Sequence, residues 1–360
     1  MRREEIKVLF GICSWGLGHA TRDLSLIKGI IEAGHQITIV ARGRSLDLLK
    51  EELGNSCHYL EIPDYSSPYS KKDFSVPKFL SYFPVYMNQF VREHEAIKKL
   101  VRREGYERIV SDNRFGIHNR EIPSYFISHQ LRFLAPGRVK LFEMATERFN
   151  YSFKNSFTKF LVPDFKEDSL SGDLSHNLKY FKERQVEYLG ILSDLRKKEV
   201  RQDIDYFISV SGPEPQRSIF EHKVLEQAPR LKGKVVVALG KPEAPQERGS
   251  SELRIFGHLN RREQEDVMNR AKLIIARPGY STLMELVALG KKALFVPTPG
   301  QTEQVYLAKY HREQGNFYSV DQNNLNLDRD VEEAKRYQGI KGKARPEETV
   351  KKFMSVVFGE

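Results

Sequence analysis

The sequence predicts an α/β protein built from two doubly wound domains with parallel sheets. Three observations lead to this fold class. The chain has 360 residues, which is long for a single hydrophobic core. Short apolar runs alternate with amphipathic segments, as in parallel βαβ units. This alternation begins near the N-terminus and begins again after a charged, poorly periodic stretch. We therefore expect a first domain over residues 1–192, a linker over 193–205, a second domain over 206–345, and a helix over 346–360 that returns to the first domain.

The first half shows the alternation from its first residues. Lys7–Cys13 is an apolar run typical of a buried parallel strand. Ala20–Ala33 carries apolar side chains at helical spacing and ends at Gly34. The same reasoning predicts strands at Gln36–Ala41, His58–Glu61, Glu107–Ser111, Ser124–Ser128 and Lys159–Val162, and helices at Ser45–Leu53 and Lys78–Arg103.

The second half repeats the pattern with new residues. We expect strands at Tyr206–Val210, Lys234–Ala238, Leu253–Phe256, Lys272–Ala276 and Ala293–Val296, and helices at Gln216–Gln227, Arg262–Arg270 and Glu347–Phe358. Two Rossmann-like domains in tandem leave a cleft between the carboxyl ends of their strands. Ligands bind at such ends in open α/β sheets, so we look for the site there.

The composition limits the kinds of molecule that the protein is expected to bind. The formal net charge is +10, which favours anionic ligands. No nucleic-acid motif accompanies it, so nucleotides, phosphates and anionic lipid headgroups remain, and nucleic acid is not expected. No apolar run approaches the roughly 18 residues of a membrane span. The N-terminus enters a strand without an apolar signal core, and the two cysteines lack metal-ligand spacing, so we expect a cytoplasmic protein with reduced cysteines.

The first candidate site follows the first strand. Gly16 and Gly18 allow a tight turn and close approach of a ligand, and His19 falls at the start of the next helix. A helix N-terminus disfavours protonation, so the imidazole is suited to act as a general base. Arg22 is expected to make a structural or phosphate-side contact. The alternative is that His19 caps the helix or binds an anion without catalysis.

Polar residues also follow two later strands of the first half. Asp112 could orient His19 or bind an acceptor hydroxyl, and Asn113 lies beside it. Arg114 could pair with Asp112 or with an acceptor phosphate. His129 ends the next strand in the same way. The alternative for Asp112–Arg114 is a salt-bridged turn, but two polar clusters at neighbouring strand ends favour a site.

Two loops of the second half could hold parts of a nucleotide. Ser211 and Gly212 leave room for a pyrophosphate after a strand, and Arg217 on the next helix could neutralise it. The loop containing Phe256 and His258 could clamp a base by stacking and backbone hydrogen bonds. A simple loop and a surface histidine are the alternatives.

The stretch Ala276–Gln304 carries the strongest signal. A strand ends there, a tight turn follows, and a helix begins at which Ser281 or Thr282 can act as cap and meet an anion. Glu285, one turn further, could hold the two hydroxyls of a ribose. Amide and carboxylate side chains in the next loop suit sugar hydroxyls; the alternative is a polar turn between strand and helix. The candidate donor-binding residues here are Arg277, Gly279, Ser281, Thr282, Glu285, Gln301, Glu303 and Gln304.

The pattern at Arg277–Gln304 resembles the donor-nucleotide site of glycosyltransferases with the GT-B fold, and in particular the MurG-like group of inverting UDP-sugar transferases. Residues Gly16–Arg22, GLGHATR, are similar to the glycine loop of that group. The resemblance implies that Glu285 holds the ribose, and that Ser281 and Thr282 face the diphosphate. Gln301 and Gln304 would contact the sugar, the Phe256–Leu259 loop would hold uracil, and His19 would be the base.

The resemblance implies transfer of a hexose or N-acetylhexosamine from a UDP-sugar to an acceptor hydroxyl, with inversion. A helix N-terminus and hydroxyls would stabilise the leaving diphosphate, so we expect no metal and no cofactor besides the UDP-sugar. The first glycine loop is less glycine-rich than that of peptidoglycan MurG, which argues against its acceptor. The alternatives are a UDP-sugar 2-epimerase on the same fold and a non-catalytic nucleotide-sugar-binding protein.

The acceptor side offers one further hypothesis. Lys78–Arg103 carries many aromatic and apolar residues followed by a basic end, and Arg132–Lys159 is similarly aromatic and basic. Aromatic residues beside cations suit a membrane interface. They are consistent with a lipid-linked acceptor and with peripheral binding to the anionic inner face of the membrane. The alternative is an apolar helix face packed on the sheet.

Overall fold

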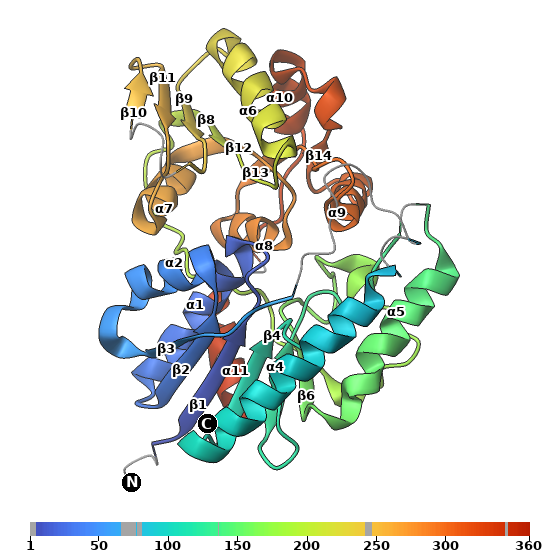
Figure 1. Cartoon of the computed structure of the whole chain (residues 1–360). Helices are drawn as coiled ribbons and strands as arrows, with labels where there is room; N and C mark the ends of the chain where they lie inside the picture. The colour runs from blue at the N-terminus through green and yellow to red at the C-terminus, as the bar shows by residue number, and fades with distance from the viewer. Residues whose placement is uncertain (1–4, 66–76, 78–80, 136, 242–246, 343–344) are drawn as a thin grey trace. The chain divides into compact units, whose positions relative to one another are not determined.

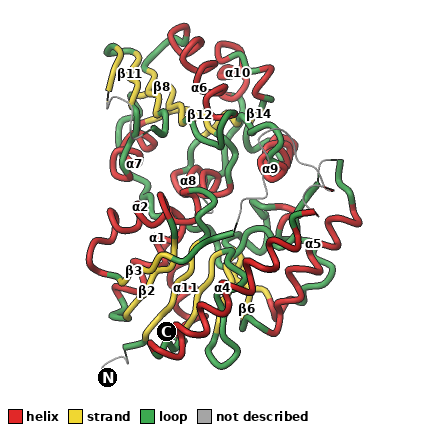
Figure 2. Tube along the Cα trace, viewed as in Figure 1, coloured by secondary structure: helices red, strands yellow, loops and turns green. Residues whose placement is uncertain are grey.

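The computed structural model describes residues 5–65, 77, 81–135, 137–241, 247–342 and 345–360. The chain divides into two compact units. The first unit contains the described residues up to Asp194 together with Arg345–Glu360. The second unit contains Leu195–Ala344. Each unit contains one sheet dominated by parallel strands, with helices packed on it (Figure 1, Figure 2). This confirms the predicted class of two doubly wound α/β domains.

The sheet of the first unit has the strand order β3-β2-β1-β4-β5-β6-β7, and its strand pairs are parallel. The chain runs outward from β1 to β3 and then crosses to β4 on the other side of β1. The strand order therefore reverses between β1 and β4, which is where such sheets bind ligands. The strands are β1 (Lys7–Ile12), β2 (Gln36–Ala41), β3 (His58–Glu61), β4 (Arg108–Asp112), β5 (Ser124–Ile127), β6 (Lys159–Val162) and β7 (Val186–Tyr188).

Helix α4 covers one face of this sheet. Its Ile97 and Val101 pack with Leu9 of β1 and Ile109 of β4 in a buried apolar cluster. Such burial stabilises by roughly 25 cal/mol per Å² of apolar surface removed from water. Pro84 lies in the first turn of α4, where its missing N–H costs no hydrogen bond. The helices of this unit are α1 (Leu17–Glu32), α2 (Gly43–Leu53), α4 (Phe83–Glu104), α5 (Lys140–Ser152) and α11 (Pro346–Phe358).

The C-terminal helix α11 packs on the first unit beside α1, and Figure 1 shows it among the elements of that unit. Gly29 makes this contact possible, because a Cβ there would lie 2.6 Å from a methyl carbon of Val350. The Arg108 side chain donates to the carbonyl of Val357 at 3.0 Å. The His35 and Phe358 rings stack at 4.6 Å. The last residues thus help to hold the sheet that carries the first candidate site.

The sheet of the second unit has the order β10-β11-β9-β8-β12-β13-β14. Its pairs are parallel except β10 with β11. The order reverses between β8 and β12, so this unit also has a switch point. The strands are β8 (Ile204–Ser209), β9 (Val235–Ala238), β10 (Glu247–Gly249), β11 (Leu253–Phe256), β12 (Ala271–Ala276), β13 (Lys292–Phe295) and β14 (Tyr318–Ser319).

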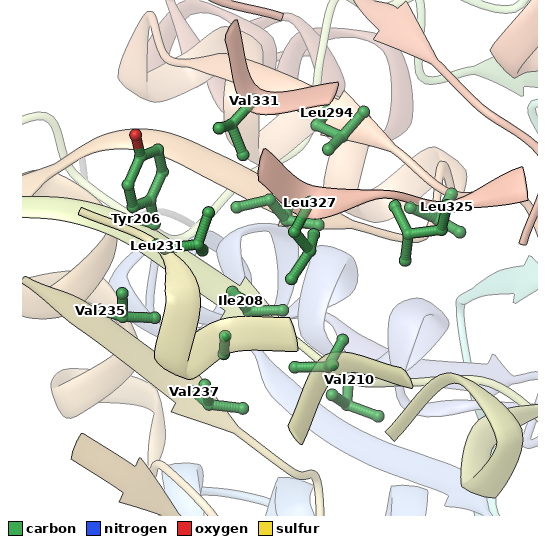
Figure 3. Packing of buried hydrophobic residues seen from close by; sticks show 14 of the residues in the cluster. Tyr206, Ile208, Val210, Leu231, Val235, Val237, Leu294, Leu325, Leu327 and Val331 are labelled. Carbon is green, nitrogen blue, oxygen red and sulfur yellow. The ribbon is translucent and has the colours of Figure 1, made fainter. Parts of the chain in front are cut away.

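The core of this unit lies between the sheet and two helices, α6 and α10. Figure 3 shows Ile208, Val237 and Leu294 of the strands meeting Leu327 and Val331 of α10. Because side chains alternate along a strand, every second strand residue contributes to this cluster. The helices are α6 (Gln216–Gln227), α7 (Arg261–Arg270), α8 (Tyr280–Leu289), α9 (Thr302–Glu313) and α10 (Leu327–Lys335).

Several element boundaries differ from the sequence prediction. The helix expected at Lys78–Arg103 is α4, Phe83–Glu104, and residues 78–80 lie outside the described part of the chain. Strand β8 begins at Ile204, so the last two residues of the expected linker belong to the sheet. The sequence prediction missed β7, β10, β14, α5 and α10. The three strands have two or three residues each, too few for a periodic pattern.

Candidate functional site

In the first unit the candidate residues gather at the switch point between β1 and β4. Helix α1 begins at Leu17 with Gly16 as its N-cap, so His19 is the third residue of the helix. Asp112 is the last residue of β4 and pairs in register with Ile12, the last residue of β1. The two parallel strands therefore end together, and their following residues share one edge of the sheet.

The imidazole of His19 contacts the carboxylate of Asp112, with 2.9 Å between Nδ1 and Oδ2. Arg22, one turn along α1, donates through Nε to the same Oδ2 at 3.1 Å and through Nη2 to Oδ1. Burial alone would raise the pKa of Asp112. The charges of Arg22 and His19 outweigh that effect and hold its pKa well below the usual range. Asp112 is therefore ionised at neutral pH.

The hydrogen bonds of Arg22 define the tautomers of two histidines. A guanidinium only donates, so Nδ1 of His129, at 2.9 Å from Nη1 of Arg22, accepts and its proton lies on Nε2. Nδ1 of His19 lies 3.0 Å from Nη2 of Arg22 as well as near Asp112. The ionised carboxylate of Asp112 is the stronger acceptor and takes the Nδ1 proton of His19 in a hydrogen bond, so Nη2 of Arg22 donates to Oδ1 of Asp112 and not to Nδ1 of His19. That leaves Nε2 of His19 able to take a proton, as a general base requires.

A second buried acid, Asp23, lies beside this cluster and was not singled out from the sequence. Its side chain is fully buried and its nearest basic atom is Nε of Arg22, at 3.9 Å. Burial and the neighbouring Asp112 carboxylate raise the pKa of Asp23 well above its usual range. The charged form of Asp23 is therefore disfavoured, and Arg22 and Asp112 form the buried ion pair. In sequence, Asp23 looked like one polar position in a helix.

Arg114 has a different partner from the one expected. It does not pair with Asp112. Its guanidinium is fully buried, donates to Glu93 of α4 at 2.6 Å, and also bonds the carbonyls of Ile62 and Pro63. We expected Arg114 to meet Asp112 or an acceptor phosphate, and burial among these groups instead gives it the task of fixing the loop after β3. Asn113 adopts a left-handed conformation with φ of 54° at the turn after β4.

In the second unit the switch point lies between β8 and β12, and Gly212 forms the turn after β8. Its φ is +116°, a conformation that favours glycine. A Cβ at this position would lie 3.4 Å from Oγ1 of Thr298 and 3.8 Å from Nε of Arg277. The backbone of Ser211–Gly212 thus passes close to side chains that follow β12 and β13. Oxygen and nitrogen atoms from three strand ends meet at this turn.

Arg277, directly after β12, is a buried cation. Only 2% of its surface is exposed. Its guanidinium donates to five acceptors, which are the carbonyls of Val296 at 2.8 Å, Pro297 at 3.1 Å, Gln216 at 3.1 Å and Ser211 at 3.4 Å, and Oε1 of Gln322. It also lies 4.3 Å from the ring centre of Phe220. Its N–H groups therefore hold the surrounding loops, and it can act on an anion through its charge. Among the described residues it has no carboxylate partner, and burial lowers its pKa to about 9. A buried charge without a counter-charge is costly, so this site is arranged to gain from a bound anion.

Thr298 adds a second polar group to the same place. Its residue surface is 1% exposed, and its Oγ1 has no hydrogen-bond partner within the described part of the chain. Its backbone N–H donates to Oε1 of Gln304 at 2.9 Å, which fixes the loop after β13. Oε1 of Gln301, the N-cap of α9, is likewise buried without a partner among those residues. Buried polar atoms are normally paired, so these two are candidates to bind a ligand.

Helix α8 starts differently from the sequence prediction. Its N-cap is Gly279, and neither Ser281 nor Thr282 caps it, because both lie within its first turn. That first turn still offers backbone N–H groups and a positive helix end to an anion. Ser281 and Thr282 are the second and third residues of α8, so their hydroxyls lie at the same helix end.

Glu285, in the second turn of α8, is already engaged. Its Oε1 lies 2.7 Å from Nη2 of Arg261, the first residue of α7, and both side chains are 8% exposed. Sequence reasoning missed Arg261, which looked like one more residue of a basic helix start. Only the packing of α7 beside α8 reveals the pair.

Four other predicted donor residues are placed less favourably. Arg217 forms ion pairs with Glu214 and, at 2.7 Å, with Glu221, so its charge is already balanced and does not need a pyrophosphate. Phe256 ends β11 with the guanidinium of Arg254 at 4.9 Å from its ring centre. His258 is exposed in the loop that follows, and Glu303 lies in the first turn of α9.

The described residues offer neither a metal-binding cluster nor a membrane-spanning helix. They contain no cluster of three or more histidine, cysteine, aspartate or glutamate side chains placed to bind a metal ion. Within the same part of the chain, no helix is both long enough and apolar enough to cross a bilayer.

Comparison with known proteins gives the family context. Residues 215–353 match the glycosyltransferase family 28 C-terminal domain. An uncharacterized glycosyltransferase of Methanosarcina acetivorans is 24% identical over 83% of this chain and 79% of its own length. One from Methanosarcina mazei is 25% identical, over 86% of this chain and 84% of its own.

Solved structures support the fold. The calicheamicin glycosyltransferase CalG4 has a TM-score of 0.62 at 14% identity, covering 99% of this chain and 95% of its own. Acinetobacter baumannii MurG has 0.61 at 12%, covering 99% and 100%. A putative UDP-N-acetylglucosamine 2-epimerase from Listeria monocytogenes has 0.64 at 13%, covering 99% and 97%, so the fold alone does not separate transferase from epimerase. The domain match and the related sequences make that distinction: this chain is a glycosyltransferase with the GT-B fold.

Proposed function

We propose that the protein transfers a hexose or N-acetylhexosamine from a UDP-sugar to an acceptor hydroxyl, as in MurG-like inverting transferases. The observation that carries the proposal is the buried guanidinium of Arg277 at the Gly212 turn, with no carboxylate partner among the described residues. A nucleotide diphosphate supplies the missing negative charge. Glu285, on the helix α8 that begins shortly after Arg277, suits the ribose of that nucleotide.

The donor half of the reaction is assigned to the second unit. The Thr298 hydroxyl and the first turn of α8 would contact the diphosphate, the nearby charge of Arg277 would stabilise it, and Gln301 and Gln304 would contact the sugar. When the bond between the anomeric carbon and the diphosphate oxygen breaks, its electron pair stays on the diphosphate. Positive charge fixed beforehand at that position stabilises the transition state. The residues present can supply this charge, so the proposal includes no cofactor, and activity should persist in EDTA.

The acceptor half is assigned to the first unit, with His19 as base. Nε2 of His19 takes the proton of the acceptor hydroxyl while the hydroxyl oxygen bonds to the anomeric carbon. Asp112 holds the Nδ1 proton of His19 at 2.9 Å and balances the imidazolium that forms. Arg22 locks Asp112 in place and is 2% exposed, so its role is to position rather than to contact the acceptor. A single displacement of this kind inverts the anomeric configuration.

We propose a lipid-linked acceptor, and the surface of α4 and α5 supports this class of acceptor. The rings of Phe83 of α4 and Phe149 of α5 meet edge to face with their centres 5.4 Å apart, so the two helices lie side by side there (Figure 1, Figure 2). On the same two helices, Val85 of α4 is 47% exposed and Leu141 of α5 is 78% exposed, next to the exposed Lys140. Apolar side chains beside a cation suit the surface of an anionic membrane.

Liposome flotation tests the membrane part. We expect the protein to float with vesicles containing anionic lipid at low salt, and Leu141→Glu to weaken this. Absence of binding at low salt would refute a membrane-bound acceptor and the peripheral location at the inner face, without affecting the donor site.

A panel assay tests the transferase proposal. UDP release from a set of UDP-sugars is measured with and without candidate acceptors, together with epimer formation. The proposal predicts UDP release that depends on acceptor and on one sugar class. UDP and a free sugar or epimer formed without any acceptor would contradict the transferase proposal and favour the 2-epimerase alternative. Binding without either reaction would indicate a nucleotide-sugar-binding protein.

A further inference from the structure

A buried ion pair joins the N-terminus of α7 to the carboxylate of α8. Nη2 of Arg261 lies 2.7 Å from Oε1 of Glu285, and each side chain is 8% exposed. Arg261 directly follows the loop from Phe256 to Asn260, which comes after β11. One guanidinium therefore connects the loop proposed to hold the base with the acid proposed to hold the ribose.

The helix start that carries Arg261 is held firmly. The side chain of Asn260 accepts from the backbone N–H of Glu263 at 3.0 Å, and the side chain of Glu263 accepts from the backbone N–H of Asn260 at 2.8 Å. Such a capping box fixes the first turn of a helix. The backbone that carries Arg261 is therefore fixed, and its guanidinium can hold the carboxylate of Glu285 in one place.

The carboxylate of Glu285 must be held in one orientation if it is to bind two hydroxyls at once. A glutamate side chain has three rotatable bonds and loses much conformational freedom when it is held in one position. A carboxylate can accept about four hydrogen bonds, so the bond from Arg261 leaves it able to accept two more from vicinal hydroxyls. A guanidinium also keeps a buried carboxylate ionised, and hydrogen bonds to an ionised acceptor are the stronger ones.

We propose that Arg261 is a positioning residue that holds Glu285 in the orientation that reads the ribose hydroxyls. The inference rests on the proposed UDP-sugar function and deepens it. Arg261 acts through Glu285, so its loss should affect recognition of the ribose more than recognition of the diphosphate, whose proposed partners are the charge of Arg277 and the hydroxyl of Thr298.

The test compares the affinities of UDP and 2′-deoxy-UDP by calorimetry for the full chain and its variants. Removing one hydroxyl that bonds a carboxylate should cost the wild type about tenfold in affinity. In Arg261→Gln this preference should fall to about twofold, because Glu285 is no longer oriented. Arg261→Lys should show an intermediate preference, because it keeps the charge without the planar fork. Arg262→Gln removes a charge from the neighbouring exposed position and should behave as the wild type.

The outcomes are distinguishable. A folded Arg261→Gln or Arg261→Lys protein with the wild-type preference for UDP overturns the inference. If Arg261→Gln does not fold, Arg261→Lys decides alone. A wild type that binds both nucleotides equally also overturns it, while nucleotide binding and the proposed function stand. A wild type that binds neither nucleotide overturns the proposed function and this inference with it.

Discussion

Nδ1 of His19 lies 2.9 Å from Oδ2 of Asp112 at a switch point of the sheet, where Asp112 ends β4 and His19 lies in the first turn of the helix that follows the neighbouring strand β1. The carboxylate is fully buried and its pKa is held low by Arg22 and His19 against the effect of burial. This contact fixes the tautomer of His19 and leaves Nε2 to act as a base. The account of the acceptor side depends on it.

Replacing Asp112 should affect catalysis and spare the donor. Asp112→Asn should lower kcat by about 10²- to 10⁴-fold, because the amide no longer accepts the Nδ1 proton reliably. Affinity for UDP should stay within about twofold, since the donor is assigned to the other unit. Steady-state kinetics and calorimetry measure the two effects on protein shown to be folded by circular dichroism.

Asp23→Asn is the matched control for that variant. Burial and Asp112 raise the pKa of Asp23 and so favour its neutral form, which an amide resembles. This variant should keep kcat within about threefold of the wild type. Equal losses in both variants would show that any change in this buried cluster disrupts the fold, and the role given to Asp112 would fall.

A second prediction concerns pH and stability. Burial, helped by the stacked ring of His94 at 4.2 Å, lowers the pKa of His118 from 6.5 to about 4. As the pH falls below 6.5, the unfolded chain takes up a proton at His118 and the folded protein does not. Folding stability should therefore decrease by about 2 kcal/mol between pH 6.5 and pH 5 from this residue.

His118→Asn should remove that part of the pH dependence, because asparagine can still donate to the carbonyl of Phe115 but does not titrate. Urea unfolding at the two pH values measures the difference. The exposed His58→Asn is the control and should leave the slope unchanged. A slope in His118→Asn equal to that of the wild type would contradict the assignment.

A third prediction separates ligand binding from folding at the donor site. Thr298→Val removes a hydroxyl that has no hydrogen-bond partner among the described residues and keeps the shape of the side chain. Stability should be unchanged or higher by about 1 kcal/mol, because a buried unpaired polar atom is lost. UDP affinity should fall about fivefold to tenfold if this hydroxyl binds the diphosphate. A clear loss of stability with unchanged UDP affinity would show that the hydroxyl serves the fold.

The fold could be predicted from the sequence because its signals are local. The period of an apolar strand or an amphipathic helix can be seen within a few residues, as in the strand over Lys7–Cys13 and the helix over Gln216–Gln227. This helix has the predicted bounds in the structure. The sequence also placed His19 and Asp112 at strand ends. Whether Asp112 contacts His19 or only an acceptor hydroxyl could not be decided without the register of β1 and β4.

The rest of the site depends on contacts between distant segments. Arg114 was expected near Asp112, but the packing of α4 brings Glu93 to it. Arg277 was assigned to the donor, but only burial shows that its charge lacks a carboxylate partner within the described part of the chain. Arg261 was missed, because its partner Glu285 lies on another helix. Charged residues have no sequence period that reveals their partners.

The most direct test of the account is the calorimetric titration of UDP into the wild type, Glu285→Ala and His19→Ala, with transfer measured on the same samples. The account predicts that the wild type and His19→Ala bind UDP alike, that Glu285→Ala binds about tenfold more weakly, and that His19→Ala makes no product. Absence of UDP binding by the wild type, or normal turnover by His19→Ala, would contradict it.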